Sequence, residues 1–175
     1  MDTYDEPDAD YRSVTELFER PPAPINWNLL GANDADLEWH DLDAWVTWLK
    51  VTFGLPPAFV PPYWHRHDEL VWELSALHTH WLSCHHESAN ASAPIAWLRD
   101  FLDARNRLRD WVAICGTRLD RDRPTRQTVW PGERAVDLGG EVPIADRKRD
   151  FEEFVRADVL RRRRIEAVAN QSVID

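Results

Sequence analysis

Histidine and cysteine residues gather in one stretch of the chain, and both residue types are metal ligands. Five of the seven histidines lie between residues 67 and 86, and Cys84 lies among them. His80 and Cys84 are four residues apart, a spacing that places both side chains on one face of a helix. The best candidate for a zinc site joins His80 and Cys84 to Cys115, the second cysteine of the chain.

A plainer interpretation competes with this zinc site. The chain has no Cys-x-x-Cys and no His-Glu-x-x-His motif, which are the spacings that mark many zinc sites. A reduced cysteine behaves as a small hydrophobic residue, so Cys84 and Cys115 also fit a helical core. We therefore expect no cofactor, and zinc is the less favoured alternative.

A second group of residues has the chemistry of acid–base catalysis: His65, His67, Asp68, Glu69 and Glu73. Acidic residues at the start of a helix have a simpler explanation, because they complement the helix dipole. The chain holds only six glycines, and neither a phosphate-binding loop nor a Gly-x-Ser-x-Gly motif is present. We assign no catalytic residue, and a metal-dependent enzyme around the histidines stays a minority hypothesis.

A basic block near the end of the chain is the candidate for nucleic-acid contact, and it consists of Arg161, Arg162, Arg163 and Arg164. Residues 151–175 hold five arginines and five acidic residues, and the whole chain has a net charge of −10. The negative net charge of the whole chain disfavours a surface that binds phosphate backbones throughout. A solvated helix face with ion pairs four residues apart, or contact with the acidic N-terminus, explains the block equally well. Nucleic-acid binding is therefore an alternative and is not favoured.

Apolar residues recur at alternating gaps of three and four residues in three places, the spacing of one helix face. Gly54 and Gly116 follow the first and third of these stripes, where glycine ends a helix. A looser stripe from Asp146 predicts a fourth helix. The three stripes are Trp39, Leu42, Val46, Leu49 and Phe53; His67, Leu70, Leu74, Leu77, Trp81 and Cys84; and Trp97, Phe101, Ala104, Leu108, Trp111 and Cys115.

These stripes predict an all-α fold, a three-helix up-down bundle rich in tryptophan. We expect a disordered acidic tail over residues 1–12, a bundle domain over 13–116, an irregular Pro/Gly loop region over 117–145 and a C-terminal helix over 146–170. No run approaches the roughly 20 apolar residues of a bilayer span, so no membrane contact is expected. Two cysteines and the lack of a secretory signal at the N-terminus favour the cytoplasm.

Three of the ten tryptophans, Trp45, Trp48 and Trp72, lie off the stripes. They are the candidates for an exposed patch, because large aromatic residues concentrate binding energy at interfaces. A protein partner or a second copy of the chain in a homodimer would cover such a patch. Burial by other parts of the chain is the alternative.

The run Pro-Pro-Tyr-Trp-His-Arg-His at residues 61–67 is followed by Glu73-Leu74, Leu77 and Trp81, and then by Trp97 and the run Arg-Asn-Arg-Leu at residues 105–108. This pattern resembles an uncharacterised family. Its members are small proteins encoded on actinobacterial plasmids, integrative elements and phages, with the pattern Pro-Cys-Trp-x-x-His and then Glu-Leu-x-x-Leu-x-x-x-Trp. The resemblance covers about residues 39–111, and Tyr63 stands where the family commonly has cysteine. It implies a mobile-element context but no activity, and it adds Trp64 and His67 to the interaction candidates as motif positions.

Taken together, these observations predict a non-enzymatic accessory protein of an actinobacterial mobile element that acts through protein–protein contacts. The alternatives are a nucleic-acid-binding factor that uses Arg161–Arg164 and a metal-dependent enzyme around the histidines.

Overall fold

The computed structural model describes residues 22–171. The acidic tail that the sequence predicts over residues 1–12 lies outside this range, as do the first nine residues of the predicted domain.

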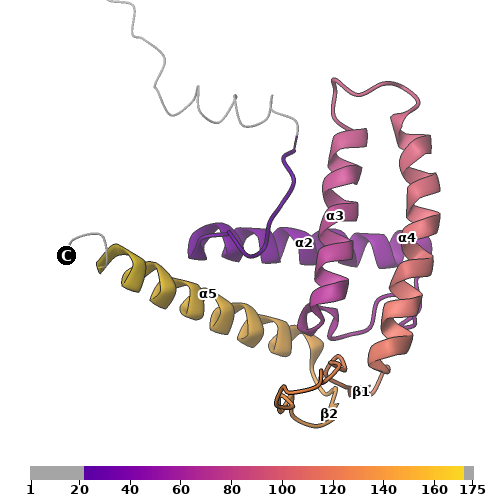
Figure 1. Cartoon of the computed structure of the whole chain (residues 1–175). Coiled ribbons are helices and arrows are strands. Elements are labelled where there is room, and N and C mark those ends of the chain that lie inside the picture. Colours follow the sequence, from indigo (N-terminus) through magenta and orange to yellow (C-terminus); the bar gives the residue numbers. More distant parts are fainter. Residues whose placement is uncertain (1–21, 172–175) are drawn as a thin grey trace, which may run out of the picture.

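The described part of the chain is mostly helical, as expected for an all-α protein, with one very small sheet (Figure 1). The C-terminal ends of α2, α3 and α4 agree with the apolar stripes of the sequence, whereas α2 begins at Ala32, before the first stripe. In chain order the elements are α2 (Ala32–Phe53), the 3-10 turn η1 (Trp64–Arg66), α3 (Asp68–Cys84), α4 (Ala93–Cys115), β1 (Arg121–Asp122), β2 (Val142–Pro143) and α5 (Arg147–Gln171).

Two of the helices end at the predicted glycines. Gly54 follows α2 with a φ of 59°, and Gly116 follows α4 with a φ of 73°. The amide of Gly116 donates to the Val112 carbonyl at 2.9 Å, and a carbonyl of the last turn of α4 thereby gains a partner. Only glycine takes this left-handed conformation without steric cost, which explains why both helices stop there.

Helices α3 and α4 form an antiparallel hairpin, while α2 runs across them (Figure 1). The Trp97 indole N–H in the first turns of α4 donates to the Leu77 carbonyl in the second half of α3. The predicted up-down arrangement therefore holds for α3 and α4, whereas α2 crosses the pair. The reason is that α2 has two apolar faces: Trp45 stacks on His78 of α3, and Trp39 packs against Phe154 of α5.

The core is rich in tryptophan, as predicted. Trp64 and Trp97 are almost completely buried, and the Trp27 and Trp39 rings lie 4.4 Å apart. The third stripe needs one correction, because Val112 is buried and Trp111 remains 39% exposed.

Helix α5 docks on α2 through both apolar and polar contacts. The Trp39 indole N–H donates to Asp158 at 3.0 Å, and Glu166 accepts a hydrogen bond from the Ala32 amide at the start of α2. Phe151, Val155 and Val159 supply the buried face of α5. The predicted C-terminal helix is thus part of the folded body.

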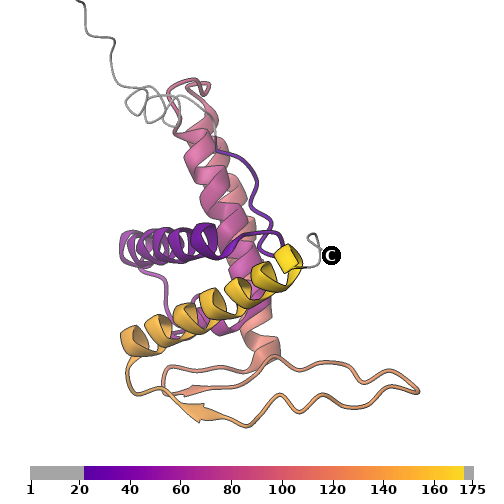
Figure 2. The same cartoon turned by 90° about the vertical axis from the view of Figure 1, so that its left-hand side faces the viewer.

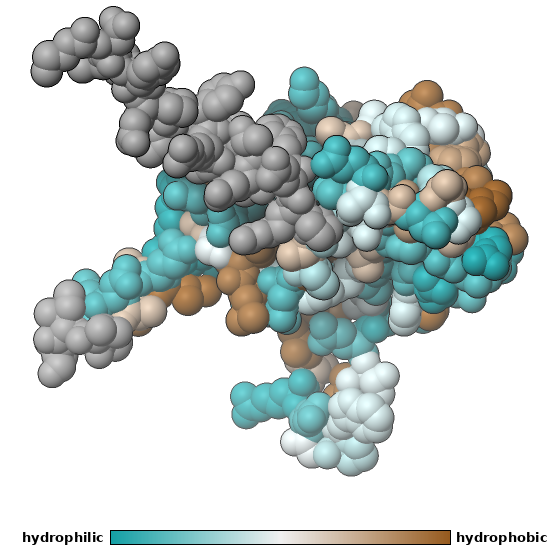
Figure 3. All heavy atoms as spheres, turned by 90° about the horizontal axis from the view of Figure 1, so that it is seen from above, coloured by the Kyte–Doolittle hydropathy of each residue, from teal (hydrophilic) through white to brown (hydrophobic). Residues whose placement is uncertain are grey.

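A long arm projects between β1 and β2 (Figure 2). The two short strands are antiparallel, with Asp122 opposite Val142. We call residues 123–141 the arm, and every residue from 126 to 141 is exposed. In Figure 3 the arm extends beyond the outline of the body at the lower edge. The sequence predicts an irregular loop here, and the structure shows it extended outwards.

Among residues 22–171, the helices are too short or too polar to cross a lipid bilayer.

Candidate functional site

The segment that links α2 to α3 carries two buried histidines, His65 and His67, with different partners. Both side chains have no exposed surface. His65 lies in η1 and faces the start of α5, whereas His67 immediately precedes α3 and faces the root of the arm. The two histidines therefore connect the helical hairpin to two later parts of the chain.

His67 is the centre of a continuous hydrogen-bond network. Its Nε2 atom lies 2.8 Å from Oδ1 of Asp122 in β1, and its Nδ1 atom lies 2.9 Å from the hydroxyl of Thr125 on the arm. The Thr125 hydroxyl in turn donates to Glu69 at 2.7 Å, and the Thr117 hydroxyl donates to Asp122 at 2.8 Å. The network ties the first turn of α3 to the root of the arm.

The charge of His67 follows from this network. Burial lowers the pKa of His67, but the hydrogen bond that His67 donates to Asp122 and the nearby Cys115 outweigh burial and raise the pKa to about 9. The ring is then an imidazolium with two N–H donors, which matches its two oxygen partners. Such a charge-assisted pair is stronger than a hydrogen bond between neutral groups.

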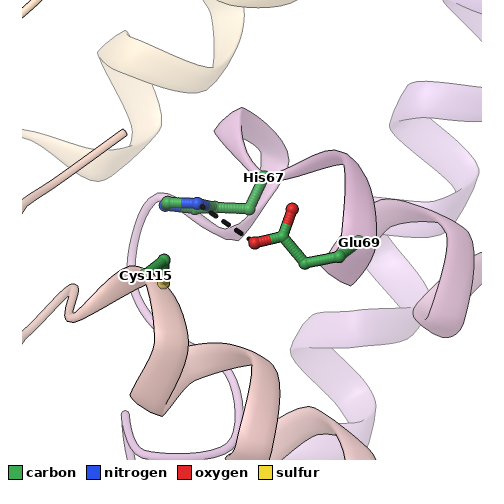
Figure 4. A group of neighbouring side chains, drawn as sticks. All are labelled: His67, Glu69 and Cys115. Carbon is green, nitrogen blue, oxygen red and sulfur yellow. Dashed lines mark ion pairs between the residues drawn. The ribbon is translucent and has the colours of Figure 1, made fainter. Parts of the chain in front are cut away.

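Cys115 completes the cluster from the end of α4. Because α3 and α4 are antiparallel, the last residue of α4 meets the first turn of α3. A ring nitrogen of His67, a carboxylate oxygen of Glu69 and the Cys115 sulfur lie within 4.8 Å of one another (Figure 4). We call His67, Glu69 and Cys115 the ligand cluster. These residue types, at such separations, are able to hold a transition-metal ion.

His65 has the opposite protonation behaviour to His67. Burial lowers the pKa of His65 to about 4, and the hydrogen bond to Asp150 only partly offsets it. The neutral ring donates from Nε2 to Oδ2 of Asp150 at 2.7 Å, and Arg66 pairs with the same carboxylate. This contact holds the start of α5 against η1.

The structure separates the residues of the predicted zinc site. His80 and Cys84 are in contact, with Nδ1 and Sγ 3.5 Å apart, and His80 also pairs with Asp100. Cys115 lies at the other end of the α3–α4 hairpin, because Cys84 ends α3 and Cys115 ends α4. It joins His67 and Glu69 instead. Sequence spacing along one helix cannot show which helix ends meet.

The five interaction candidates divide into buried and half-exposed residues. Trp45, Trp64 and His67 are buried and cannot contact a partner without unfolding. Trp48 and Trp72 remain 39% and 40% exposed. Trp72 lines two hollows of about 400 and 460 Å³, both of which also contact the segment before α2, and the first is bordered by α5 as well.

The arginine block is partly used inside the protein. Arg162 bonds to Asp158 and donates to the carbonyls of Trp27 at 2.9 Å and Leu30 at 2.7 Å. Arg161 also pairs with Asp158. Arg163 and Arg164 are exposed. The block therefore fastens α5 to the segment before α2 and presents fewer than four arginines to phosphate.

The arm carries an exposed aromatic residue that no pattern in the sequence indicates as a site. Trp130 is 64% exposed, and Val129 and Val136, which also lie on the arm, are 53% and 65% exposed. The adjacent Pro-Gly pair signals a turn, but the sequence does not show that this turn stands away from the body.

Comparisons with protein-family models, with curated proteins and with solved structures find no match to this chain.

Proposed function

We propose that the protein is a non-enzymatic interaction protein whose arm binds a partner protein. The observation that carries the proposal is the exposed Trp130 on a segment that projects from the folded body. Tryptophan is among the residues that dominate binding energy when a partner buries them.

The apolar residues of the arm have no role in the core of the described structure. Residues 126–141 are all exposed, so Val129, Trp130, Val136 and Leu138 do not stabilise the body by burial. On the upper face of the body, hydrophobic residues are scattered among hydrophilic ones (Figure 3). These four apolar residues lie within ten positions of one another on a projecting element, and an exposed tryptophan in such a place is typical of a binding surface.

Contacts at the root and the tip of the arm favour an ordered shape. Glu141 pairs with Arg121 at 2.9 Å and with Arg123, so both sides of the root are joined. At the tip, the Glu133 amide donates to the Trp130 carbonyl at 3.0 Å. An arm that is partly ordered before binding loses less conformational entropy when it meets its partner.

The proposal places the protein as an accessory factor of an actinobacterial mobile element, the context that the resemblance over residues 39–111 implies. Nucleic-acid binding is less well supported, because Arg162 has internal partners and the net charge of the chain is −10.

Site-specific photo-crosslinking from the arm tests the proposal. A photoreactive amino acid replaces Trp130 in one variant and Val51 in a control variant, since Val51 is 80% exposed on α2, away from the arm. The position-130 variant should trap a defined protein in cells, and the position-51 variant should not. The purified partner should then bind Trp130→Ala about 30-fold more weakly than wild type, the equivalent of about 2 kcal/mol.

The helix-surface tryptophans are the matched controls for this affinity measurement. Trp48→Ala, Trp72→Ala and Trp111→Ala each remove a tryptophan that is about 40% exposed on the body. These variants should retain wild-type affinity. Equal crosslinking from positions 51 and 130, or a larger loss of affinity with Trp48→Ala or Trp72→Ala, contradicts an arm-based function.

A further inference from the structure

We infer that His67, Glu69 and Cys115 form a binding site for one zinc ion at the root of the arm. The site combines an imidazole nitrogen, a carboxylate oxygen and a sulfur within 4.8 Å of one another. Zinc takes three such protein ligands in many sites, with a fourth position for another donor. Small side-chain shifts bring ligands at this separation to bonding distance.

Burial makes the cluster unlike a chance group of surface residues. His67 has no exposed surface, Cys115 is 2% exposed, and the Glu69 side chain is 14% exposed. The three residues also come from ends of two helices that pack tightly together, so their separations are fixed by the α3–α4 hairpin. A rigid, water-poor site of this kind favours a metal ion once its ligands lose their protons.

The hydrogen bonds of His67 indicate which nitrogen takes the ion. Nε2 faces Asp122 at 2.8 Å, while Nδ1 faces Glu69, with Nδ1 and Oε1 3.8 Å apart. Coordination through Nδ1 keeps the bond from Nε2–H to the Asp122 carboxylate. A histidine that binds metal through one nitrogen and donates to a carboxylate from the other is the usual arrangement in zinc proteins.

The donor set determines the class of ion. A thiolate and an imidazole favour zinc and other borderline or soft ions over Mg²⁺ and Ca²⁺, which prefer oxygen ligands. Binding releases one proton from the Cys115 thiol and one from Nδ1 of His67 to solvent. The two positive charges of Zn²⁺ take the place of these two protons beside Glu69 and Asp122.

Zinc at this site would change the root of the arm. The Thr125 hydroxyl now bridges Nδ1 of His67 and the Glu69 carboxylate. An ion between these two groups takes over the position of the hydroxyl, so Thr125 either moves away or becomes the fourth ligand. The site thus couples metal binding to the position of the arm.

Zinc titration of untagged protein tests the inference, with native mass spectrometry as the readout. Protein stripped with a chelator should bind one Zn²⁺ per chain, and Co²⁺ in its place should give the absorption bands of a thiolate ligand. Cys115→Ser should abolish binding, and Cys84→Ser is the matched control because Cys84 is the other buried free cysteine. Glu69→Gln provides a second ligand variant if Cys115→Ser does not fold.

Asp122→Asn tests the arrangement around the ligand cluster. Loss of the carboxylate that orients His67 should weaken zinc binding by about 10- to 100-fold without removing it. Circular dichroism verifies that each variant retains its helices.

Three results would overturn the inference: wild-type protein that binds no zinc at micromolar concentration, equal binding by Cys115→Ser and wild type, or binding that Cys84→Ser alone abolishes. The last result places the ion at His80 and Cys84. None of these measurements involves a partner protein, so the zinc site and the proposed function of the arm stand or fail separately.

Discussion

The two histidines before α3, His65 and His67, have opposite pKa shifts because their hydrogen-bond partners differ. His65 and His67 are two residues apart and equally buried, yet the pKa of His65 falls to about 4 and that of His67 rises to about 9. Burial lowers both, and only at His67 do the surrounding groups outweigh it. The sequence singles out His67 as a motif position but contains no sign of Asp122, 55 residues away, as its partner.

The raised pKa of Glu38 makes the stability of the protein depend on pH, and a single substitution tests this dependence. Burial, with a smaller effect from Asp41, raises the pKa of Glu38 to about 7, and its Oε1 atom is buried without a hydrogen-bond partner in the described structure. A raised pKa in the folded state means that the contribution of Glu38 to stability is present below pH 4.5 and is lost as the pH rises through 7.

Glu38→Gln removes this dependence. We expect the variant to gain about 1 kcal/mol in the free energy of unfolding relative to wild type between pH 4.5 and pH 8, a value reduced for partial solvent exposure. Guanidinium denaturation at both pH values measures the difference. A gap between variant and wild type that does not change with pH would show that Glu38 ionises normally.

At the level of elements, α5 shows how a helix with a short apolar face docks. Its buried residues Phe151, Val155 and Val159 lie in its first half, and farther along the helix Arg162 and Glu166 make the contacts with the start of α2 and the segment before it. Arg162 donates to the Trp27 and Leu30 carbonyls at the turn before α2. The arginine block is therefore in part a structural feature.

The arginines of the block should differ in their effect on stability. Arg162→Ala removes bonds to Asp158 and to the Trp27 and Leu30 carbonyls, and we expect a loss of about 2 kcal/mol in the free energy of unfolding. Arg164→Ala, an exposed position in the same block, should change stability by less than about 0.5 kcal/mol. Urea denaturation of both variants measures the contrast, and equal losses would refute the structural role of Arg162.

The elements were far more predictable than their contacts. Alternating gaps of three and four residues located α2, α3 and α4, and Gly54 and Gly116 marked two of the helix ends, because these signals are local. The crossing of α2 over the hairpin, the meeting of Cys115 with His67, and the outward course of the arm depend on packing between distant segments. A single sequence contains no local signal for such contacts.

The whole molecule consists of a tryptophan-rich helical body and an arm that leaves it at the ligand cluster. The body buries Trp64 and Trp97 completely or nearly so, whereas the arm keeps Trp130 exposed. The same residue type therefore has two roles, one in the core and one on the surface. The network around His67 joins both parts, since Asp122 and Thr125 lie at the root of the arm.

Replacing tryptophan in each part should separate these roles. Trp64→Ala leaves a cavity in the core, and we expect a loss of about 3–5 kcal/mol in the free energy of unfolding. Trp130→Ala removes no buried contact, so its melting temperature should equal that of wild type within about 2 °C. Differential scanning calorimetry of both variants measures this, and a clear destabilisation by Trp130→Ala would mean that the arm packs on the body.

Partner binding by an arm-shortened variant tests the central claim most directly. Two glycines replace residues 128–138, which leaves Thr125 and the pairing of Glu141 with Arg121 and Arg123 at the root. We expect this variant to keep the helical content and melting temperature of wild type and to lose all measurable binding to the partner crosslinked through position 130. Wild-type affinity in the shortened variant would contradict the assignment of the arm as the binding element.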